Sequence, residues 1–472
     1  MISRLLFTLG LVFGSGLAVA DPAPQPNIVM IAVDDLNDWV GCLGGHSQTI
    51  TPNIDRLAAR GVLFSNAHCV TPLCGPSRTS VFTGLRPTST GIYDNAVWFR
   101  NVEQLKDIPT LPQSLQAGGY KTIAMGKLFH TSVENGQPTS EFQHVARHLW
   151  SDYGPFPEEP FNYKDPVFRL RDWGAWPPTD EENCDHIIAT RAVEFLAKPR
   201  EEAFFLAVGL FRPHAPFYAA PKWYDMHPRD SVKLPPARAD DLDDVPKSSK
   251  IMTRSFDPEW VRANGKAPDL VQAYLACVSF VDSQVGRIVD AIDASAHRDN
   301  TIIVLWSDHG FHLGEKQHFG KTTLWERASH VPLIFTGPGI AKNARCTRPA
   351  SLLDVYPTLL ALAGCAARTD LAGVDLTPQL RDPSAEKPSP AVITYLRGNH
   401  AVRSERWRYL RYADGAEELY DMRVDPNEWT NLAADPSKAA IIAEHRRWLP
   451  AEEAAPQQRK ARGTRKTEAT DQ

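Results

Sequence analysis

Short stretches in which nearly every residue is apolar alternate with amphipathic stretches along most of the chain. Asn27 to Val33, Ala203 to Leu210 and Thr301 to Trp306 belong to the first kind, and each ends within one residue of a polar segment. Apolar runs of this length are typical of central strands that are covered on both faces of a sheet. Lys121 to Met125 has a similar pattern and predicts a fourth strand.

The stretches between these runs have helical features. Pro52 to Arg60 begins with a proline and is followed by Gly61, which are common start and stop signals of a helix. Leu111 to Gly118 also has a helical pattern, and Leu270 to Ile292 carries apolar residues at helical spacing. Strands that alternate with helices predict an α/β fold with a large, mainly parallel central sheet flanked by helices.

The C-terminal part of the chain has a different pattern. Ala391 to Leu396, Ala401 to Tyr412 and Glu418 to Asp421 are short strand-like runs, with turn residues at Asp414-Gly415. They predict a smaller antiparallel sheet.

Two stretches, from about residue 133 to 180 and from 219 to 267, have little periodicity and are rich in Pro, Trp, Asp and Tyr. We expect long loops there, lying over the functional face.

The N-terminus has the pattern of a secretory signal. Arg4 precedes a mostly apolar stretch from Leu5 to Leu17, and Ala18-Val19-Ala20 has the small residues of a cleavage site. Residues 1–20 are therefore expected to be a signal peptide, and the mature protein to be exported, either periplasmic or secreted. No later stretch is apolar for long enough to predict a membrane span.

The composition excludes some classes of protein. The 472 residues carry a formal net charge of −5, which excludes the broad basic field of a nucleic-acid-binding protein. An anionic substrate would have to be held by a few local cations. The seven cysteines are too few for a disulfide scaffold in a chain of this length, and the sequence leaves their pairing open.

Acidic residues and a histidine follow two of the predicted strands. Asp34-Asp35 and Asp308-His309 stand at the ends of strands, where ligands bind in open α/β sheets. Lys127 and His214 also fall at such ends, so we expect these residues to converge. Three carboxylates and a fourth ligand form a site that suits calcium or magnesium better than zinc. Taken singly, each pair is also compatible with an ordinary turn or helix cap.

Cys74 lies in the run Cys74-Gly75-Pro76-Ser77-Arg78, whose proline and serine favour the start of a helix. An atom with negative charge is favoured at that position. A buried structural cysteine and a reactive thiolate are the alternatives, but neither accounts for the whole pentapeptide.

Cys-x-Pro-Ser-Arg with Thr83-Gly84 shortly after it resembles the sulfatase signature, in which a separate maturation enzyme oxidises the cysteine to formylglycine. The likeness runs from Asp34 to about Leu432 and includes these segments: Thr51-Pro52-Asn53-Ile54-Asp55, Gly126-Lys127-Leu128-Phe129-His130, Arg212-Pro213-His214, Ser307-Asp308-His309-Gly310, Leu313-Gly314-Glu315, Lys321 and His330-Val331-Pro332-Leu333-Ile334. It implies the sulfatase fold, shared with alkaline phosphatase, and hydrolysis of sulfate esters.

The resemblance also implies a set of site residues. One calcium ion would be bound by Asp34, Asp35, Asp308, His309 and the modified residue at Cys74. Around it, the residues implied to bind sulfate or to move protons are Arg78, Lys127, His130, His214 and Lys321. We expect residues 21–385 to form the catalytic domain, 386–453 a smaller C-terminal subdomain and 454–472 a disordered tail, since that tail is polar and charged.

Within the family the sequence looks most similar to iduronate-2-sulfatases. Many sulfatases have Lys-x-His after the strand, whereas this chain has the longer spacing of that subgroup, Lys127-Leu128-Phe129-His130, together with Asp308-His309. A sulfated saccharide is thus the expected substrate. Arylsulfatase activity, phosphate or phosphonate ester hydrolysis, and a non-catalytic glycan-binding relative are the alternatives.

Overall fold

The structure is a computed structural model. It describes residues 25–130, 141–145, 153–162, 170–251 and 256–458. The expected signal peptide lies outside these residues, as do three segments of the first predicted loop and most of the predicted tail.

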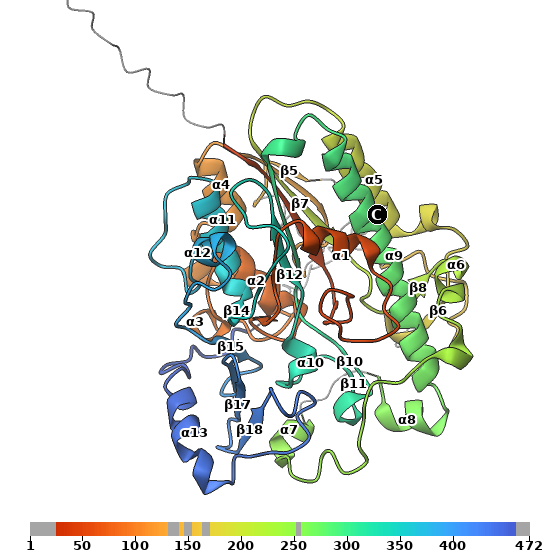
Figure 1. The fold of residues 1–472 in the computed structure, drawn as a ribbon, viewed down its shortest axis with the longest axis vertical. Helices are drawn as coiled ribbons and strands as arrows, with labels where there is room; N and C mark the ends of the chain where they lie inside the picture. The colour runs from red at the N-terminus through yellow and green to blue at the C-terminus, as the bar shows by residue number, and fades with distance from the viewer. Residues whose placement is uncertain (1–24, 131–140, 146–152, 163–169, 252–255, 459–472) are drawn as a thin grey trace, which may run out of the picture.

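A central sheet, eight-stranded in the described part of the chain, forms the middle layer of the molecule (Figure 1). The four predicted strands lie side by side in it and are parallel to one another. Among these eight strands, only β12 (Leu333–Thr336) runs antiparallel to both of its neighbours. In spatial order the strands are β13 (Ala344–Cys346), β2 (Val62–Phe64), β12 (Leu333–Thr336), β9 (Thr301–Ser307), β1 (Asn27–Val33), β7 (Phe204–Leu210), β4 (Lys121–Gly126) and β5 (His144–Val145).

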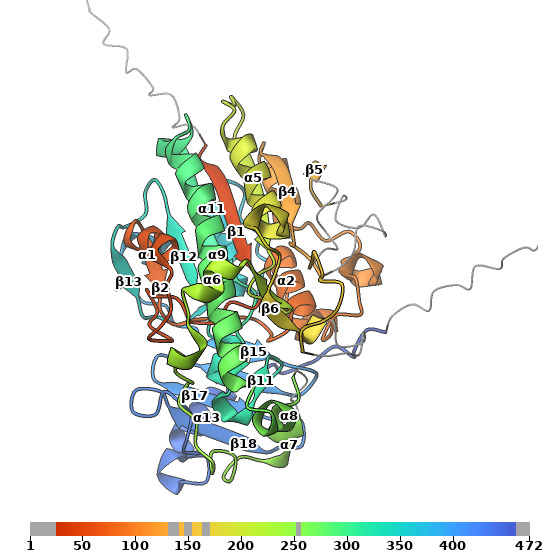
Figure 2. The ribbon, with the colours of Figure 1, turned by 90° about the vertical axis from the view of Figure 1, so that its right-hand side faces the viewer.

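Helices cover both faces of this sheet, so every residue of its central strand β1 is buried. Alternate side chains of a strand point to opposite faces, so Val29 and Ile31 enter one hydrophobic core whereas Ile28 and Met30 enter the other. The first core contains helices α1 (Pro52–Ala59), α5 (Cys184–Leu196) and α9 (Ala267–Asp293), and the second contains α2 (Cys74–Thr83), α4 (Leu111–Ala117) and α11 (Val355–Leu362). Figure 2 shows the long helix α9 lying across its face of the sheet.

The predicted C-terminal sheet is present, and the strands are antiparallel. The stretch from Ala401 to Tyr412, predicted as one run, is divided by a turn near Glu405, so the sheet has four strands rather than three. They are β15 (Ala391–Thr394), β16 (His400–Arg403), β17 (Trp407–Arg411) and β18 (Glu417–Asp421), accompanied by helix α13 (Ala439–Arg446) at one end of the molecule (Figure 1).

The first residues of the predicted tail are ordered. The amide of Ala454 donates to the carbonyl of Thr88, and the amide of Gln457 donates to the carbonyl of Gly91. These contacts attach the chain to helix α3 (Pro87–Thr90) and the residue after it. The prediction of disorder is therefore wrong for residues 454–458, because backbone hydrogen bonds compensate for the lack of apolar side chains.

The two predicted loops contain more regular structure than their composition suggested. The second includes the short helices α6 (Pro221–Asp225), α7 (Lys247–Ile251) and α8 (Pro258–Ala263). In the first, β6 (Trp173–Ala175) pairs with β8 (Phe217–Ala219). The remaining elements are β3 (Ala67–His68), β14 (Ala350–Ser351), β10 (His312–Leu313), β11 (Phe319–Gly320), α10 (Glu326–Ser329) and α12 (Thr377–Arg381). Among the described residues, no helix is both long and apolar enough to span a membrane.

Candidate active site

Four neighbouring strands deliver their following residues to one edge of the central sheet. Asp34 follows β1, Lys127 follows β4, and Asp308 and His309 follow β9, while His214 stands a short loop beyond β7. Because these strands are parallel and adjacent, their carboxyl ends lie together. The convergence that the sequence predicted is present.

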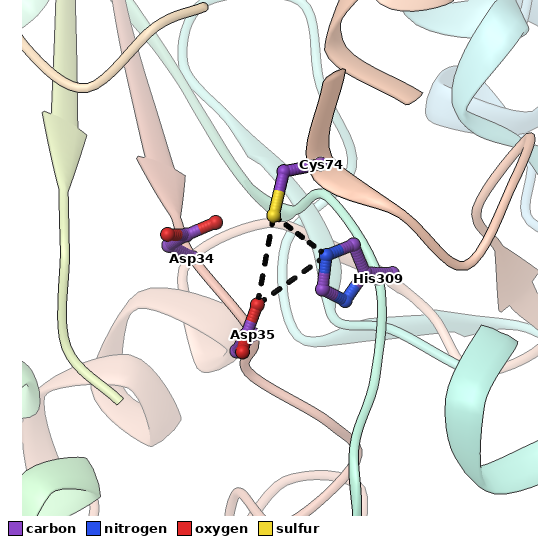
Figure 3. Close-up of side chains that lie close together, drawn as sticks. All are labelled: Asp34, Asp35, Cys74 and His309. Atoms are coloured by element: carbon purple, nitrogen blue, oxygen red, sulfur yellow. Dashed lines mark hydrogen bonds and ion pairs between the residues drawn. The ribbon is translucent and has the colours of Figure 1, made fainter. Parts of the chain in front are cut away.

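Asp34 and Asp35 turn toward the same place although they are adjacent in the chain. Asp35 has a φ of 60°, in the left-handed region that a non-glycine residue rarely adopts. This conformation breaks the alternation of a strand, so both carboxylates approach the cysteine and the histidine drawn in Figure 3. Backbone strain of this kind is typical of functional sites.

Cys74 is the first residue of α2, as predicted, and its side chain is fully buried. Its Sγ lies 3.2 Å from Nε2 of His309 and 3.9 Å from Oδ1 of Asp35 (Figure 3). Nζ of Lys321, which comes from the end of the β10–β11 hairpin, lies 3.1 Å from the same sulfur and 2.7 Å from Oδ1 of Asp35. Cys74 is thus surrounded by an imidazole, a carboxylate and an ammonium group.

The donor set fits a divalent cation. One ligand atom each from Asp34, Asp35, Cys74 and His309 lies within 4.8 Å of the others, and all four residues are buried. Nδ1 of His309 is 3.0 Å from the carbonyl oxygen of Gly310, so Nδ1 is the donor and Nε2 is left to face the site. Asp308 lies beside this group, with Oδ2 at 3.8 Å from Nε2 of His309.

Arg78 connects the carboxylates. Its Nε donates to Oδ2 of Asp308 at 2.7 Å, its Nη2 donates to Oδ1 of Asp34 at 3.2 Å, and its Nη1 donates to the carbonyl of Lys127. The recorded hydrogen bonds of this guanidinium, which is fully buried, are to the two carboxylates and the backbone. Arg78 therefore fixes the orientation of Asp34 and Asp308.

Lys127 and His214 lie on the side of Asp34. Nζ of Lys127 donates to Oδ2 of Asp34 and, at 3.2 Å, to the hydroxyl of Tyr153. The rings of Tyr153 and His214 are 4.8 Å apart between centroids. Nδ1 of His214 bonds the carbonyl oxygen of Ala215, which leaves Nε2 free for other partners.

His130 lies on the Cys74 side of the site. Its side chain lies close enough to Cys74 for the two groups to interact, and its buried Nδ1 has no hydrogen-bond partner within the described part of the chain. Burial lowers the pKa of His130, and the nearby Lys127 and Lys321 lower it further. The imidazole is therefore favoured in its neutral form, which accepts a proton.

The site strongly perturbs its titratable groups. Burial alone would raise the pKa of the Cys74 thiol, but Lys127, Lys321 and His309 bring it well below its usual value. Burial and Cys74 would likewise raise the pKa of Asp34, but Lys127, His214 and Arg78 bring it below the usual range. An atom with negative charge is thus stabilised at position 74.

Asp308 behaves differently from Asp34. Burial raises its pKa to about 7, against the lowering effect of Arg78 and with a further rise from Asp34. Two neighbouring carboxylates whose pKa values move apart are typical of a functional site.

Several supporting residues were not predicted as site residues from the sequence. The hydroxyl of Ser77 donates to the carbonyl of Asp308 at 2.7 Å, and the hydroxyl of Tyr274 donates to the carbonyl of Asp35 at 2.8 Å. Oδ1 of Asn95 accepts from the amide of Gly75 at 2.7 Å. Ser77 belongs to the signature pentapeptide, whereas Tyr153 lies in the aperiodic first loop region.

Comparisons with known proteins agree with this arrangement. The family described as Sulfatase matches residues 26–365, and the family described as N-sulphoglucosamine sulphohydrolase, C-terminal, matches residues 314–454. A protein named Sulfatase from Formosa agariphila is 43% identical over 426 residues, which cover 87% of this chain and 83% of the relative. Human iduronate 2-sulfatase is 31% identical over 375 residues, which cover 71% of this chain and 65% of the relative.

A solved structure has the same fold. A protein described as a 2-O GAG sulfatase superposes with a TM-score of 0.69 at 26% identity, covering 90% of each chain. The family matches and the similar relatives extend over most of the sequence, and the solved structure shares the fold. These findings lead to one conclusion. The chain belongs to the sulfatase family of sulfuric ester hydrolases.

Proposed function

We propose that this protein removes sulfate from a sulfated, uronic-acid-containing saccharide, with a formylglycine derived from Cys74 as the nucleophile. The observation that carries the proposal is the position of Cys74. Its side chain begins a helix and contacts His309, Lys321 and His130 beside two buried carboxylates. An unmodified cysteine in a purely structural role would not require this arrangement of charges.

One calcium ion held by Asp34, Asp35, Asp308, His309 and the modified residue 74 would supply positive charge to the nucleophilic oxygen and to a sulfate oxygen. The Sγ atom of Cys74 stands in for the oxygen of the hydrated aldehyde. This chain's residues prepare that oxygen: Asp308, whose pKa is raised by burial, accepts its proton. Arg78 holds Asp308 in place through their hydrogen bond.

In the first chemical step the oxygen at residue 74 forms a bond to sulfur, and the bond from sulfur to the sugar oxygen breaks. Lys127 and Lys321 neutralise the charge of the sulfate oxygens. The ammonium group of Lys127 contacts the carboxylate of Asp34, and that of Lys321 contacts Cys74. Nε2 of His214, protonated, gives a proton to the departing sugar oxygen. This histidine is held for that role by its Nδ1 contact with Ala215.

The second step releases sulfate. His130 takes the proton of the other hydroxyl at residue 74, the carbonyl of the aldehyde forms, and the carbon–oxygen bond to the bound sulfate breaks. The contact of neutral His130 with Cys74 supports this role. A serine in the same place would lack the second hydroxyl and would stay sulfated.

The names of the relatives support the substrate. Human iduronate 2-sulfatase and a relative named delta 4,5-hexuronate-2-O-sulfatase both suggest a sulfate on carbon 2 of a uronic acid, and the 2-O GAG sulfatase agrees with a 2-O-sulfate. The spacing from Lys127 to His130 and the pair Asp308-His309 are also those of the iduronate-2-sulfatase subgroup. The proposed location is outside the cytoplasm, after cleavage of the signal peptide near Ala20.

The test uses protein produced together with a formylglycine-generating enzyme. We expect the peptide that contains residue 74 to carry an aldehyde by mass spectrometry. We also expect sulfate release to be faster from a 2-O-sulfated uronic acid disaccharide than from 4-nitrophenyl sulfate. An unmodified thiol in protein that is fully active would overturn the mechanism. A preference for the aryl ester would overturn the substrate.

A further inference from the structure

Tyr153 lies against Lys127 and His214 on the Asp34 side of the site. Its hydroxyl is 3.2 Å from Nζ of Lys127, and that ammonium group is 5.1 Å from the centroid of the Tyr153 ring. The ring also contacts His214, at 4.8 Å between centroids, and Phe211, at 5.1 Å. Lys127 and His214 are the groups proposed to face the sulfate and the departing oxygen, so Tyr153 is located at the same place.

A buried arginine fixes this position. Nη2 of Arg212 donates to the carbonyl of Tyr153 at 2.7 Å, and Nη1 donates to the carbonyl of His214 at 3.4 Å. The amide of Arg212 is in turn bound by Oδ2 of Asp185 at 2.7 Å. Arg212 thus connects two segments far apart in the sequence and sets Tyr153 and His214 beside each other.

The Tyr153 hydroxyl retains a proton to donate. A phenol has one donor and two acceptor positions, and the ammonium of Lys127 occupies an acceptor position. Within the described ranges, no acceptor for the phenolic proton is recorded. Burial raises the pKa of Tyr153, against the lowering effect of Lys127, so the hydroxyl stays protonated at neutral pH.

A purely structural role would be to cover the ammonium group of Lys127 with the aromatic ring. That role needs the ring but does not need the hydroxyl. A phenylalanine would perform it equally well, with less cost of burying a polar group. The hydroxyl and its available proton therefore point to a ligand.

We propose that the Tyr153 hydroxyl donates a hydrogen bond to an oxygen of the bound sulfate, next to the ammonium of Lys127. The inference rests on the proposed function, because it assumes that sulfate occupies the space beside Lys127 and Cys74. Hydrogen bonds to charged groups contribute about 1.5–3 kcal/mol, which corresponds to roughly a 10- to 150-fold change in binding.

The test compares Tyr153→Phe with the wild-type protein, both matured and loaded with calcium. Inorganic sulfate, the product, is the probe, and its affinity is measured by calorimetry and by competitive inhibition of disaccharide hydrolysis. We expect sulfate to bind at least about tenfold more weakly to the variant, as the loss of one charged hydrogen bond requires. The aldehyde content and the melting temperature should stay unchanged.

Tyr120→Phe is the matched control. Tyr120 precedes β4 whereas Lys127 follows it, so the two tyrosines lie toward opposite ends of the same strand. The Tyr120 hydroxyl donates to the carbonyl of Pro26 at 2.7 Å, away from the site. Its loss should leave sulfate binding as in the wild type.

Unchanged sulfate affinity in Tyr153→Phe would overturn the inference, as would an equal loss in Tyr120→Phe. The proposed function fails in a different way: the wild type would release no sulfate from any sulfated probe. If sulfate still bound to that inactive protein and bound more weakly to Tyr153→Phe, the role of Tyr153 would stand without the enzymatic proposal.

Discussion

Nζ of Lys321 lies 3.1 Å from Sγ of Cys74, closer than any carboxylate oxygen for which a contact with that sulfur is recorded. The ammonium group also contacts Oδ1 of Asp35 at 2.7 Å. Burial would lower the pKa of Lys321, but Asp35 and Cys74 raise it above its usual value. Lys321 therefore holds a permanent positive charge at the proposed nucleophile.

Replacing Lys321 by methionine should remove this charge while retaining most of the side-chain volume. We expect kcat/KM for sulfate release to fall by about 10²- to 10³-fold, the typical effect of removing one group that stabilises transition-state charge. Lys342→Met is the control. Lys342 is exposed and comes after β12, whose carboxyl end lies at the edge of the sheet opposite the site. A decrease smaller than about threefold in Lys321→Met would contradict the role.

Calcium should stabilise the folded protein through the buried carboxylates. A ligand that binds only the native state adds about 2.7 kcal/mol at a concentration one hundred times its Kd. We therefore expect the melting temperature to rise with added calcium and to fall again with a chelator. The rate of sulfate release should rise and fall in the same way.

The matched variants for this experiment are Asp35→Asn and Asp299→Asn. Asp35 belongs to the buried donor group, whereas the side chain of Asp299 is 86% exposed. The calcium-dependent rise in melting temperature should disappear only in Asp35→Asn. If the wild-type melting temperature ignores calcium and chelator-treated protein keeps full activity, there is no such site.

Local patterns were sufficient to predict the strands that organise the site. The run that forms β1 is apolar from Ile28 to Val33, as expected for a strand covered on both faces, and Asp34 marks its end. The same reasoning places Asp308 after β9. Cys74 was identified by the sulfatase-like pentapeptide together with the helix start that Pro76 and Ser77 favour.

Contacts between distant segments could not be predicted in this way. Tyr153 reaches Lys127 from an aperiodic stretch, and Arg212 holds it there across a large sequence separation. The left-handed backbone of Asp35 leaves no pattern either, because it depends on the packing around the strand end. The four-stranded C-terminal sheet was predicted with three strands since the turn near Glu405 contains no glycine or proline.

The buried position of Asp282 predicts that the free energy of unfolding depends on pH, independently of catalysis. It lies on α9 and accepts hydrogen bonds from the backbone of Asn53 and Ile54 at the start of α1, where Thr51 provides no side-chain cap. Burial raises the pKa of Asp282 to about 6 although these hydrogen bonds oppose the change. The folded state therefore binds the proton more tightly than the unfolded state does.

A raised carboxyl pKa means that the contribution of Asp282 to the free energy of unfolding decreases as pH rises from about 4 to 6. Asp282→Asn removes this titration. Relative to the wild type, the variant should gain about 2 kcal/mol between pH 4.5 and pH 7.5 in urea unfolding experiments. A difference between the two proteins that does not change with pH would contradict the raised pKa.

Lys316 connects the hairpin that carries Lys321 to the rest of the molecule. Its Nζ donates to Oδ1 of Asp241 at 2.8 Å and to the carbonyl of Glu428, and both ionic side chains are buried. Its φ of 53° is unfavourable for lysine, so these contacts stabilise a strained backbone.

Lys316→Met leaves the carboxylate of Asp241 buried without its partner, and we expect a loss of about 3–5 kcal/mol in the free energy of unfolding. Methionine has the same backbone strain, so the change tests the charge alone. The double variant Lys316→Met with Asp241→Asn should be more stable than Lys316→Met, because no buried charge remains. Lys222→Met removes an ion pair whose lysine is 62% exposed and should cost less than about 1 kcal/mol. The two single variants, Lys316→Met and Asp241→Asn, and the double variant form a double-mutant cycle. Additive losses of stability in this cycle would show that Lys316 and Asp241 act independently. Coupled losses, together with a lower kcat/KM in Lys316→Met, would show that the pair positions Lys321.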